Sequence, residues 1–151
     1  MVQARVGVIG YGVVGAATAG LFDNPAIYDP PKGYEDPTVL TDCDVIFMAV
    51  PVPTVLGKND LTIVHEVLGT ITPILRPDQI IAMRSTVLPG TVRALQEQYP
   101  GVRFASNPEF LRAHRAFDDA RHPYRVVIGA AEPGIAERVA DVYRAVLDPD
   151  V

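Results

Sequence analysis

Residues 45–50 are hydrophobic at every position, and this run constrains the fold more than any other feature of the sequence. A strand of that composition is buried on both faces, which is typical of a parallel sheet covered by helices. Shorter apolar runs predict further strands at residues 6–9, 26–29, 79–83, 102–105 and 125–129. Helical spacing predicts helices at residues 13–22, 61–75, 91–98 and 131–147. This alternation predicts an α/β fold: a doubly wound, Rossmann-type, mainly parallel sheet with helices on both faces, in one domain spanning residues 1–151.

Two connections are predicted to be irregular. Residues 30–37 form a proline-rich loop without periodicity, and residues 51–59 form a second proline-bearing loop. Asp60 follows that second loop, where its side chain is placed to cap the next helix.

Composition and charge exclude several classes of protein. The formal net charge is −5 and no Lys/Arg cluster occurs, which disfavours binding of nucleic acid. The N-terminal apolar run is too short for a transmembrane helix and lacks the layout of a signal peptide, so we expect no membrane and a cytoplasmic location. The single cysteine, Cys43, has no intrachain partner. His65 and His122 lack acids or cysteines at metal-ligand spacing, so we predict no metal site.

Residues 10–15 read G-Y-G-V-V-G, directly after a predicted strand and before a predicted helix. In that context the G-x-G-x-x-G pattern predicts a dinucleotide site, whereas the glycines alone would indicate only a turn. Asp29 lies nineteen positions after Gly10, close to the offset expected of the acid that binds the adenosine ribose. A carboxylate there accepts hydrogen bonds from the ribose hydroxyls and repels a 2′-phosphate, which favours NAD over NADP. The alternative is a solvated acid at a strand end.

Three later segments carry a more specific pattern. Residues 49–62 read A-V-P-V-P-T-V-L-G-K-N-D-L-T, residues 84–91 read R-S-T-V-L-P-G-T, and residues 106–112 read S-N-P-E-F-L-R. In order and spacing, these segments resemble the N-terminal NAD-binding domain of the UDP-glucose/GDP-mannose 6-dehydrogenases. The strand predicted at residues 125–129 also resembles its counterpart there.

The resemblance implies the oxidation of a sugar C6 alcohol to a carboxylate by two NAD, through a thioester on a cysteine of a following domain. It implies catalytic roles for Thr86 and Glu109, and a sugar pocket edged by Phe110, Leu111 and Arg112. The implied cofactor contacts are Gly10, Tyr11, Gly12, Val13, Val14, Gly15, Asp29, Val50, Pro51 and Thr86. The alternative is that Ser85 and Thr86 are capping hydroxyls and Glu109 is a loop acid.

The sequence departs from the family pattern in three places. The family has a second glutamate and a glycine after the arginine, where this chain has Ala113 and His114. The segment between Asp29 and Asp44 is compressed. The central helix and the sugar-binding domain with the catalytic cysteine are expected to be absent from these 151 residues, and Cys43 is expected to be a structural residue rather than a substitute.

Three functions remain open at this stage. The chain is an NAD(H)-binding protein without complete activity, or the cofactor-binding half of an enzyme completed by another chain, or a small NAD-dependent oxidoreductase with a new site around Glu109 and His114. An exposed apolar patch near Val142, Val146 and Leu147 would favour the second. We expect the isolated chain to be inactive toward UDP-glucose; the sequence leaves the nucleotide sugar and the oligomeric state open.

Overall fold

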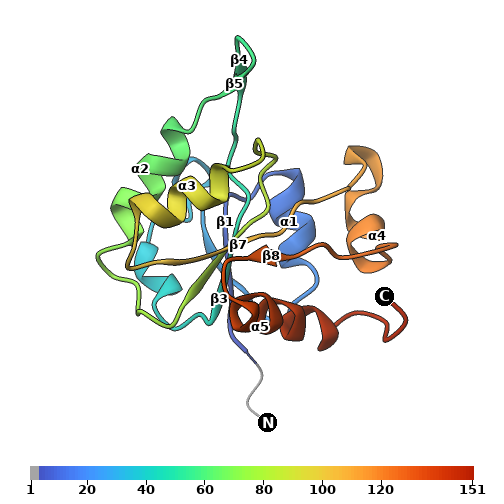
Figure 1. Cartoon of the computed structure of the whole chain (residues 1–151). Helices are drawn as coiled ribbons and strands as arrows, with labels where there is room; N and C mark the ends of the chain where they lie inside the picture. The colour runs from blue at the N-terminus through green and yellow to red at the C-terminus, as the bar shows by residue number, and fades with distance from the viewer. Residues whose placement is uncertain (1–3) are drawn as a thin grey trace.

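Six strands form the central sheet in the computed structural model, which describes residues 4–151 (Figure 1). In spatial order they are β2 (Ala26–Tyr28), β1 (Val6–Ile9), β3 (Val45–Met48), β6 (Ile80–Met83), β7 (Arg103–Ser106) and β8 (Gly129–Ala130). The first five pair in parallel, and β8 pairs antiparallel with β7. The predicted mainly parallel sheet is therefore confirmed. Residues 1–3, which belong to the segment where we expect no signal peptide, lie outside the described residues.

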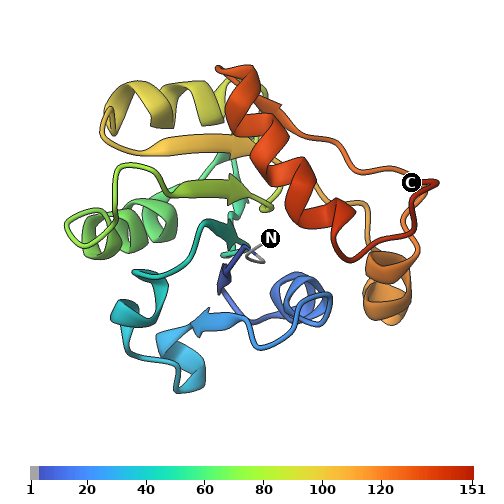
Figure 2. The same cartoon turned by 90° about the horizontal axis from the view of Figure 1, so that it is seen from below.

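Helices cover both faces of the sheet (Figure 2). The helices α2 (Thr62–Ile71) and α3 (Thr91–Gln98) pack on one face, and α1 (Val13–Ala19) and α5 (Pro133–Arg144) pack on the other. A short helix, α4 (Ala116–Arg121), packs against the outer side of α1. This arrangement is the doubly wound Rossmann-type architecture expected from the sequence.

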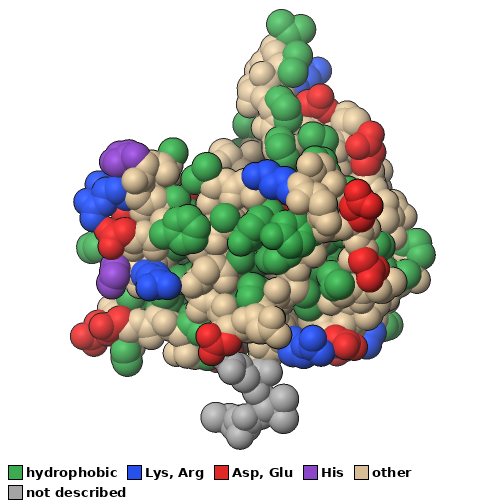
Figure 3. Space-filling model, turned by 180° about the vertical axis from the view of Figure 1, so that it is seen from behind, with side chains coloured by type: hydrophobic (Ala, Val, Ile, Leu, Met, Phe, Trp, Pro, Cys, Tyr) green, Lys and Arg blue, Asp and Glu red, His purple; other side chains and the backbone are tan. Residues whose placement is uncertain are grey.

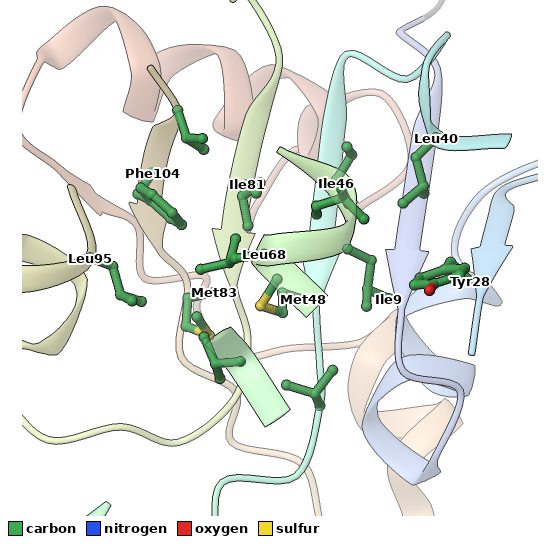
Figure 4. Close-up of a cluster of buried hydrophobic side chains, with 14 of the residues drawn as sticks. Ile9, Tyr28, Leu40, Ile46, Met48, Leu68, Ile81, Met83, Leu95 and Phe104 are labelled. Carbon is green, nitrogen blue, oxygen red and sulfur yellow. The ribbon is translucent and has the colours of Figure 1, made fainter. Parts of the chain in front are cut away.

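Successive side chains of β3 point to opposite faces of the sheet, and both faces are covered, which explains why every residue of this strand is apolar. Ile46 and Met48 belong to the cluster beneath α2 and α3, while Val45 and Phe47 belong to the cluster beneath α5. All four side chains are buried. In the first cluster, Leu68 of α2 lies against side chains from the neighbouring strands (Figure 4). Burial of both strand faces is thus what the hydrophobic run encodes.

The structure corrects the strand predicted at residues 125–129. Only Gly129 joins the sheet, and residues 125–128 approach it without ladder pairing. The side chain of Asn107 donates to the Val127 carbonyl at 2.9 Å, and Val126 and Ile128 pack on the core. The apolar pattern therefore reflects burial of this segment without the extended backbone pairing of a strand.

The two connections predicted to be irregular contain regular elements. The short 3-10 helix η1 (Pro30–Lys32) lies within the proline-rich loop. A second 3-10 helix, η2 (Pro37–Leu40), begins at the last residue of that loop, and its Leu40 is fully buried. A hairpin of β4 (Thr54–Val55) and β5 (Lys58–Asn59) occupies the second loop and projects from the domain (Figure 1). Both predictions of plain loops were wrong, since proline positions and a two-residue turn gave no periodic signal.

Helix boundaries also differ from the predictions: α1 ends at Ala19 rather than at residue 22, and α2 ends at Ile71 rather than at residue 75. The helix predicted from residue 61 begins at Thr62, and the Asp60 side chain accepts hydrogen bonds from the Thr62 amide and hydroxyl at 3.0 and 2.6 Å. Asp60 thus acts one residue before the cap position. The last helix spans Pro133–Arg144 rather than residues 131–147, and α4 was missed because its six residues are too few for a clear helical period.

The chain reverses its winding direction at β1. It moves from β1 outward to β2, then returns to the opposite side of β1 to form β3. In open parallel sheets, ligands bind in the crevice beyond the carboxyl ends of the strands at such a switch point. The turn after β1 and the loop after β3 border this crevice, and they contain the predicted glycine motif and Pro51.

An ion pair fixes α4 to the loop that follows β7. Both carboxylate oxygens of Asp119 accept hydrogen bonds from the Arg112 side chain, at 2.9 and 2.7 Å. The Arg112 backbone amide donates to the same carboxylate at 2.9 Å. The hydrogen bonds from Arg112 hold the pKa of the Asp119 carboxyl well below its ordinary value. The pair thereby sets the position of the N-P-E-F-L-R segment.

Substitution of Gly15 by alanine should destabilise the domain. A Cβ atom at Gly15 would lie 1.7 Å from the carbonyl oxygen of Gly10, so the turn and α1 would have to separate. We expect the free energy of unfolding to fall by about 3 kcal/mol or more, measured by urea denaturation. The matched control is Gly69→Ala in α2, where a Cβ meets nothing within 4 Å; this variant should gain about 0.5–1 kcal/mol. Equal stability of the two variants would contradict the close approach.

Substitution of Asp119 by asparagine should remove a pH-dependent part of the stability. Because the folded-state pKa of Asp119 is depressed, its stabilisation is complete above the ordinary pKa of 3.8 and is lost as the pH falls below that value. Asp119→Asn should therefore be less stable than the parent at neutral pH, and the gap should narrow under acid conditions. Urea unfolding at several pH values measures this. Asp23→Asn, at an exposed acid that accepts no hydrogen bond from residues 4–151, is the control and should leave the pH profile unchanged.

Candidate functional site

The glycine motif forms a turn in which three stretches of backbone approach closely. Gly10 has φ +84°, and a Cβ there would lie 2.5 Å from the Ala49 carbonyl oxygen. Gly15 approaches the Gly10 carbonyl more tightly still, since a Cβ there would lie 1.7 Å from its oxygen. At Gly12, by contrast, a Cβ would meet nothing within 4 Å. Gly10 and Gly15 thus close the turn against β3 and α1, whereas Gly12 leaves its backbone open to a ligand.

The carboxylate of Asp29 lies over this turn. Its Oδ2 atom accepts a hydrogen bond from the Tyr11 amide at 2.6 Å. The backbone of Asp29 pairs with that of Tyr34, whose ring meets the Tyr11 ring edge-on with centroids 5.3 Å apart. Asp29 and the glycine motif are therefore brought together as predicted, and Tyr34 forms an aromatic wall beside them that the sequence analysis missed. The absence of periodicity around Tyr34 left no signal for it.

A cavity of about 310 Å³ lies at the switch point between the turn and the loops after β3 and β6. It is lined by seven of the predicted site residues: Gly12, Val13, Val14, Val50, Pro51, Thr86 and Glu109. Gly10 and Gly15 lie beneath it as buried parts of the turn. Segments separated by up to a hundred positions in the sequence thus contribute to one concave surface.

Ser85 and Asn59 hold the loops that surround this cavity. The Ser85 hydroxyl donates to the Val50 carbonyl at 2.6 Å and so ties the loop after β6 to the loop after β3. The Asn59 side chain accepts from the Leu88 amide at 2.7 Å and ties the same loop to the projecting hairpin. Thr86 is exposed between these two attachments. Thr86 therefore lines the cavity from a loop that is anchored on both sides.

The segment after β7 borders a second cavity of about 490 Å³. Glu109, Phe110, Leu111 and Arg112 all line it. The Glu109 Oε2 atom accepts from the Leu111 amide at 2.6 Å, and the Arg125 guanidinium lies 5.2 Å from the centre of the Phe110 ring. Leu111 packs against α1 and α4. The predicted catalytic acid and the predicted sugar-edge residues thus line the same cavity.

Three residues near the cavities escaped the sequence analysis as functional positions. Arg84, Asn107 and Tyr143 form a buried polar network between the sheet and α5. The motifs contained Arg84 and Asn107, but only the packing of α5 brings the Tyr143 hydroxyl to them.

His114 is exposed in η3 (Ala113–Arg115) and lines neither cavity that contains Glu109.

Several surface features bear on partners. Val142 is buried, and Val146 and Leu147 are half-buried, so the exposed apolar patch that would favour a completing chain is not formed by these residues. Hydrophobic side chains gather instead at the tip of the β4–β5 hairpin, where Leu56 is 97% exposed (Figure 3).

Among residues 4–151, no helix is long and apolar enough to cross a membrane. The same residues contain no group of three or more His, Cys, Asp or Glu side chains that could hold a metal ion.

The site has the features that a dinucleotide requires. The turn offers an open backbone at Gly12, and the first turn of α1 contains no acidic residue and no side-chain cap, so its amides are free for an anionic group. The Asp29 carboxylate stands at one end of the turn, and the cavity with Thr86 lies at the other. The Asp29 carboxylate suits the adenosine ribose of NAD, and the open turn suits its pyrophosphate. The cavity with Thr86 suits the nicotinamide.

Comparison with known proteins agrees with this geometry. A sequence model described as the UDP-glucose/GDP-mannose dehydrogenase family, NAD binding domain, matches residues 35–147. The UDP-glucose 6-dehydrogenase of Pseudomonas aeruginosa is 36% identical over 115 residues, which cover 69% of this chain and 25% of the relative. This chain therefore spans about a quarter of the length of the curated relatives it matches.

Solved structures give the same result. A UDP-glucose dehydrogenase from Pyrobaculum islandicum aligns over 98% of this chain and 45% of its own, with a TM-score of 0.76 and 29% identity. A GDP-mannose dehydrogenase from Pseudomonas aeruginosa aligns over 95% and 44%, with a TM-score of 0.73 and 25% identity. The chain belongs to the UDP-glucose/GDP-mannose dehydrogenase family, of which it forms the NAD-binding domain.

Proposed function

We propose that this domain binds NAD(H) in the crevice at the switch point and serves the oxidation of a nucleotide sugar whose remaining catalytic groups lie outside residues 1–151. The cavity that joins the glycine turn to Thr86 and Glu109 is the observation that carries this proposal. It connects a cofactor-binding turn to the two side chains that could act on a substrate. The family relationship supplies the reaction class, and the arrangement of this cavity supports it.

Asp29 is the proposed determinant of cofactor choice. Its Oδ2 atom is held by the Tyr11 amide, which fixes the carboxylate above the turn. Oδ1 accepts no hydrogen bond from the described residues and is free for a ribose hydroxyl. A 2′-phosphate at that position would meet a fixed negative charge. NADH is therefore preferred to NADPH.

Thr86 and Glu109 are the proposed reactive side chains of this domain. NAD supplies hydride acceptance when bound, and the Thr86 hydroxyl can orient a water or a sugar hydroxyl beside it. The Leu111 amide holds Oε2 of Glu109, so that Oε1 is the atom that can take a proton from a water during thioester hydrolysis. Neither side chain can form a covalent thioester, so a nucleophile from elsewhere is required.

Cys43 does not provide that nucleophile. Its side chain is buried before β3, and it lines neither of the two cavities that contain Glu109. Burial raises the pKa of its thiol to about 11, so the thiolate that would attack an aldehyde is scarce at neutral pH. We therefore propose that the isolated domain binds cofactor without oxidising a sugar. A new active site around Glu109 and His114 is less well supported, because His114 lines neither of the cavities that contain Glu109.

Titration with reduced cofactors tests the binding proposal. The chain contains no tryptophan, so the fluorescence of bound NADH can be followed with little protein background. We expect saturable binding of NADH and at least about tenfold weaker binding of NADPH. Asp29→Ala should weaken NADH binding about tenfold, the equivalent of one hydrogen bond to a charged group. Asp29→Asn keeps an acceptor without the charge, so it should reduce mainly the discrimination against NADPH. Equal affinities for both cofactors would refute the role of Asp29.

Incubation of the pure domain with NAD and UDP-glucose tests the proposed inactivity. We expect no sustained increase in absorbance from NADH, because no thiolate is available beside the cofactor. The same sample should bind NADH in the titration above, which controls for a folded and competent site. Steady NADH production that is lost in Glu109→Gln would overturn the proposal and indicate a complete active site within this chain.

A further inference from the structure

Arg84 is a buried cation without a counter-ion. Its side chain follows β6 and is 6% exposed. Nη1 donates to the Asn107 Oδ1 at 3.2 Å and to the Tyr143 hydroxyl at 3.1 Å, and both acceptors are neutral. The Nε atom is buried and has no partner among the described residues. Arg84 forms no salt bridge with any of them either.

This cation lies where the two cavities meet. Arg84 lines the cofactor cavity of about 310 Å³ and also the second cavity of about 490 Å³. Only Glu109 shares this position, and its Oε2 atom is engaged by the Leu111 amide rather than by Arg84. Arg84 thus belongs to the walls of both cavities, and it forms no ion pair with the described residues.

Neighbouring charges do not complete the site. Arg112 is neutralised by Asp119, and Arg125 is exposed over the Phe110 ring. Arginine keeps its charge at all accessible pH values, and burial of an unpaired charge is unfavourable. An anion that reaches Arg84 from either cavity would therefore relieve an existing electrostatic penalty.

We propose that Arg84 is the cationic group of a binding site for a ligand carboxylate at the junction of the two cavities. A planar guanidinium whose fork is partly unpaired suits a carboxylate, which it can bind through two parallel hydrogen bonds. A carboxylate brings one negative charge to the junction, whereas a phosphate dianion would bring two beside the carboxylate of Glu109. The identity of the ligand rests on the proposed function, since a sugar carbon oxidised beside Thr86 ends as a carboxylate at this junction.

The Nε–H resonance of Arg84 provides a direct test in the full chain. The protein is labelled with ¹⁵N and titrated with sodium acetate, with sodium chloride at equal ionic strength, and with sodium phosphate. We expect acetate alone to shift the Arg84 Nε–H signal in a saturable manner. No shift, an equal shift with chloride, or a larger shift with phosphate would each overturn the proposal.

Variants separate binding from folding. Acetate affinity is followed at the Thr86 amide: Arg84→Met should lose binding, and Arg84→Lys should keep the charge but bind about fivefold or more weakly, because the fork is lost. The matched control is Arg125→Met, at an arginine of the second cavity, which should bind acetate within about twofold of the parent. Unchanged acetate affinity in Arg84→Lys, or equal losses in Arg125→Met, would overturn the assignment.

The acetate titration is carried out with and without saturating NADH. Loss of acetate binding with intact NADH binding contradicts only the Arg84 site. Loss of NADH binding with intact acetate binding contradicts only the proposed cofactor function. The two proposals therefore fail separately.

Discussion

The close approach of backbone at the turn after β1 is the constraint on which the site depends. The Gly15 backbone packs on the Gly10 carbonyl, and Gly10 itself packs on the Ala49 carbonyl at the end of β3. These contacts fix the start of α1 relative to β1 and β3, because no side chain fits between these segments of backbone. The crevice at the switch point, the exposed backbone of Gly12 and the position of Asp29 all follow from this arrangement.

A second set of interactions fixes the loops on the far side of the crevice. The Ser85 hydroxyl links the loops after β6 and β3, and Asn107 links β7 to the segment before β8. The Tyr143 hydroxyl of α5 donates to Asn107 at 2.6 Å, and burial raises the pKa of that hydroxyl, which keeps it a donor. A buried polar network of this kind is favourable only when its members are satisfied. The unpaired Nε of Arg84 is the exception, and Arg84 lines both cavities.

The domain combines an NAD-binding fold with a second cavity that is lined by the residues predicted to contact a sugar. Arg112, expected to edge a sugar pocket, is held by Asp119 of α4, so its guanidinium positions the loop. Glu109 faces both cavities, while the second family glutamate is replaced by Ala113. Cys43, the one cysteine of the sequence, lines neither of these two cavities.

The sequence by itself determined the sheet and the place of its glycine turn, because hydrophobic periodicity and glycine spacing report burial and backbone freedom locally. Residues 45–50 required two covered faces, and Asp29 lay at the offset that a ribose acid needs. Tertiary structure alone decided which polar groups meet. The Arg84–Asn107–Tyr143 network, the Arg112–Asp119 pair and the failure of residues 125–128 to pair as a strand all depend on side chains brought together from distant segments. Local periodicity carries no information about such pairings, since they are set by the docking of α4 and α5 on the finished sheet.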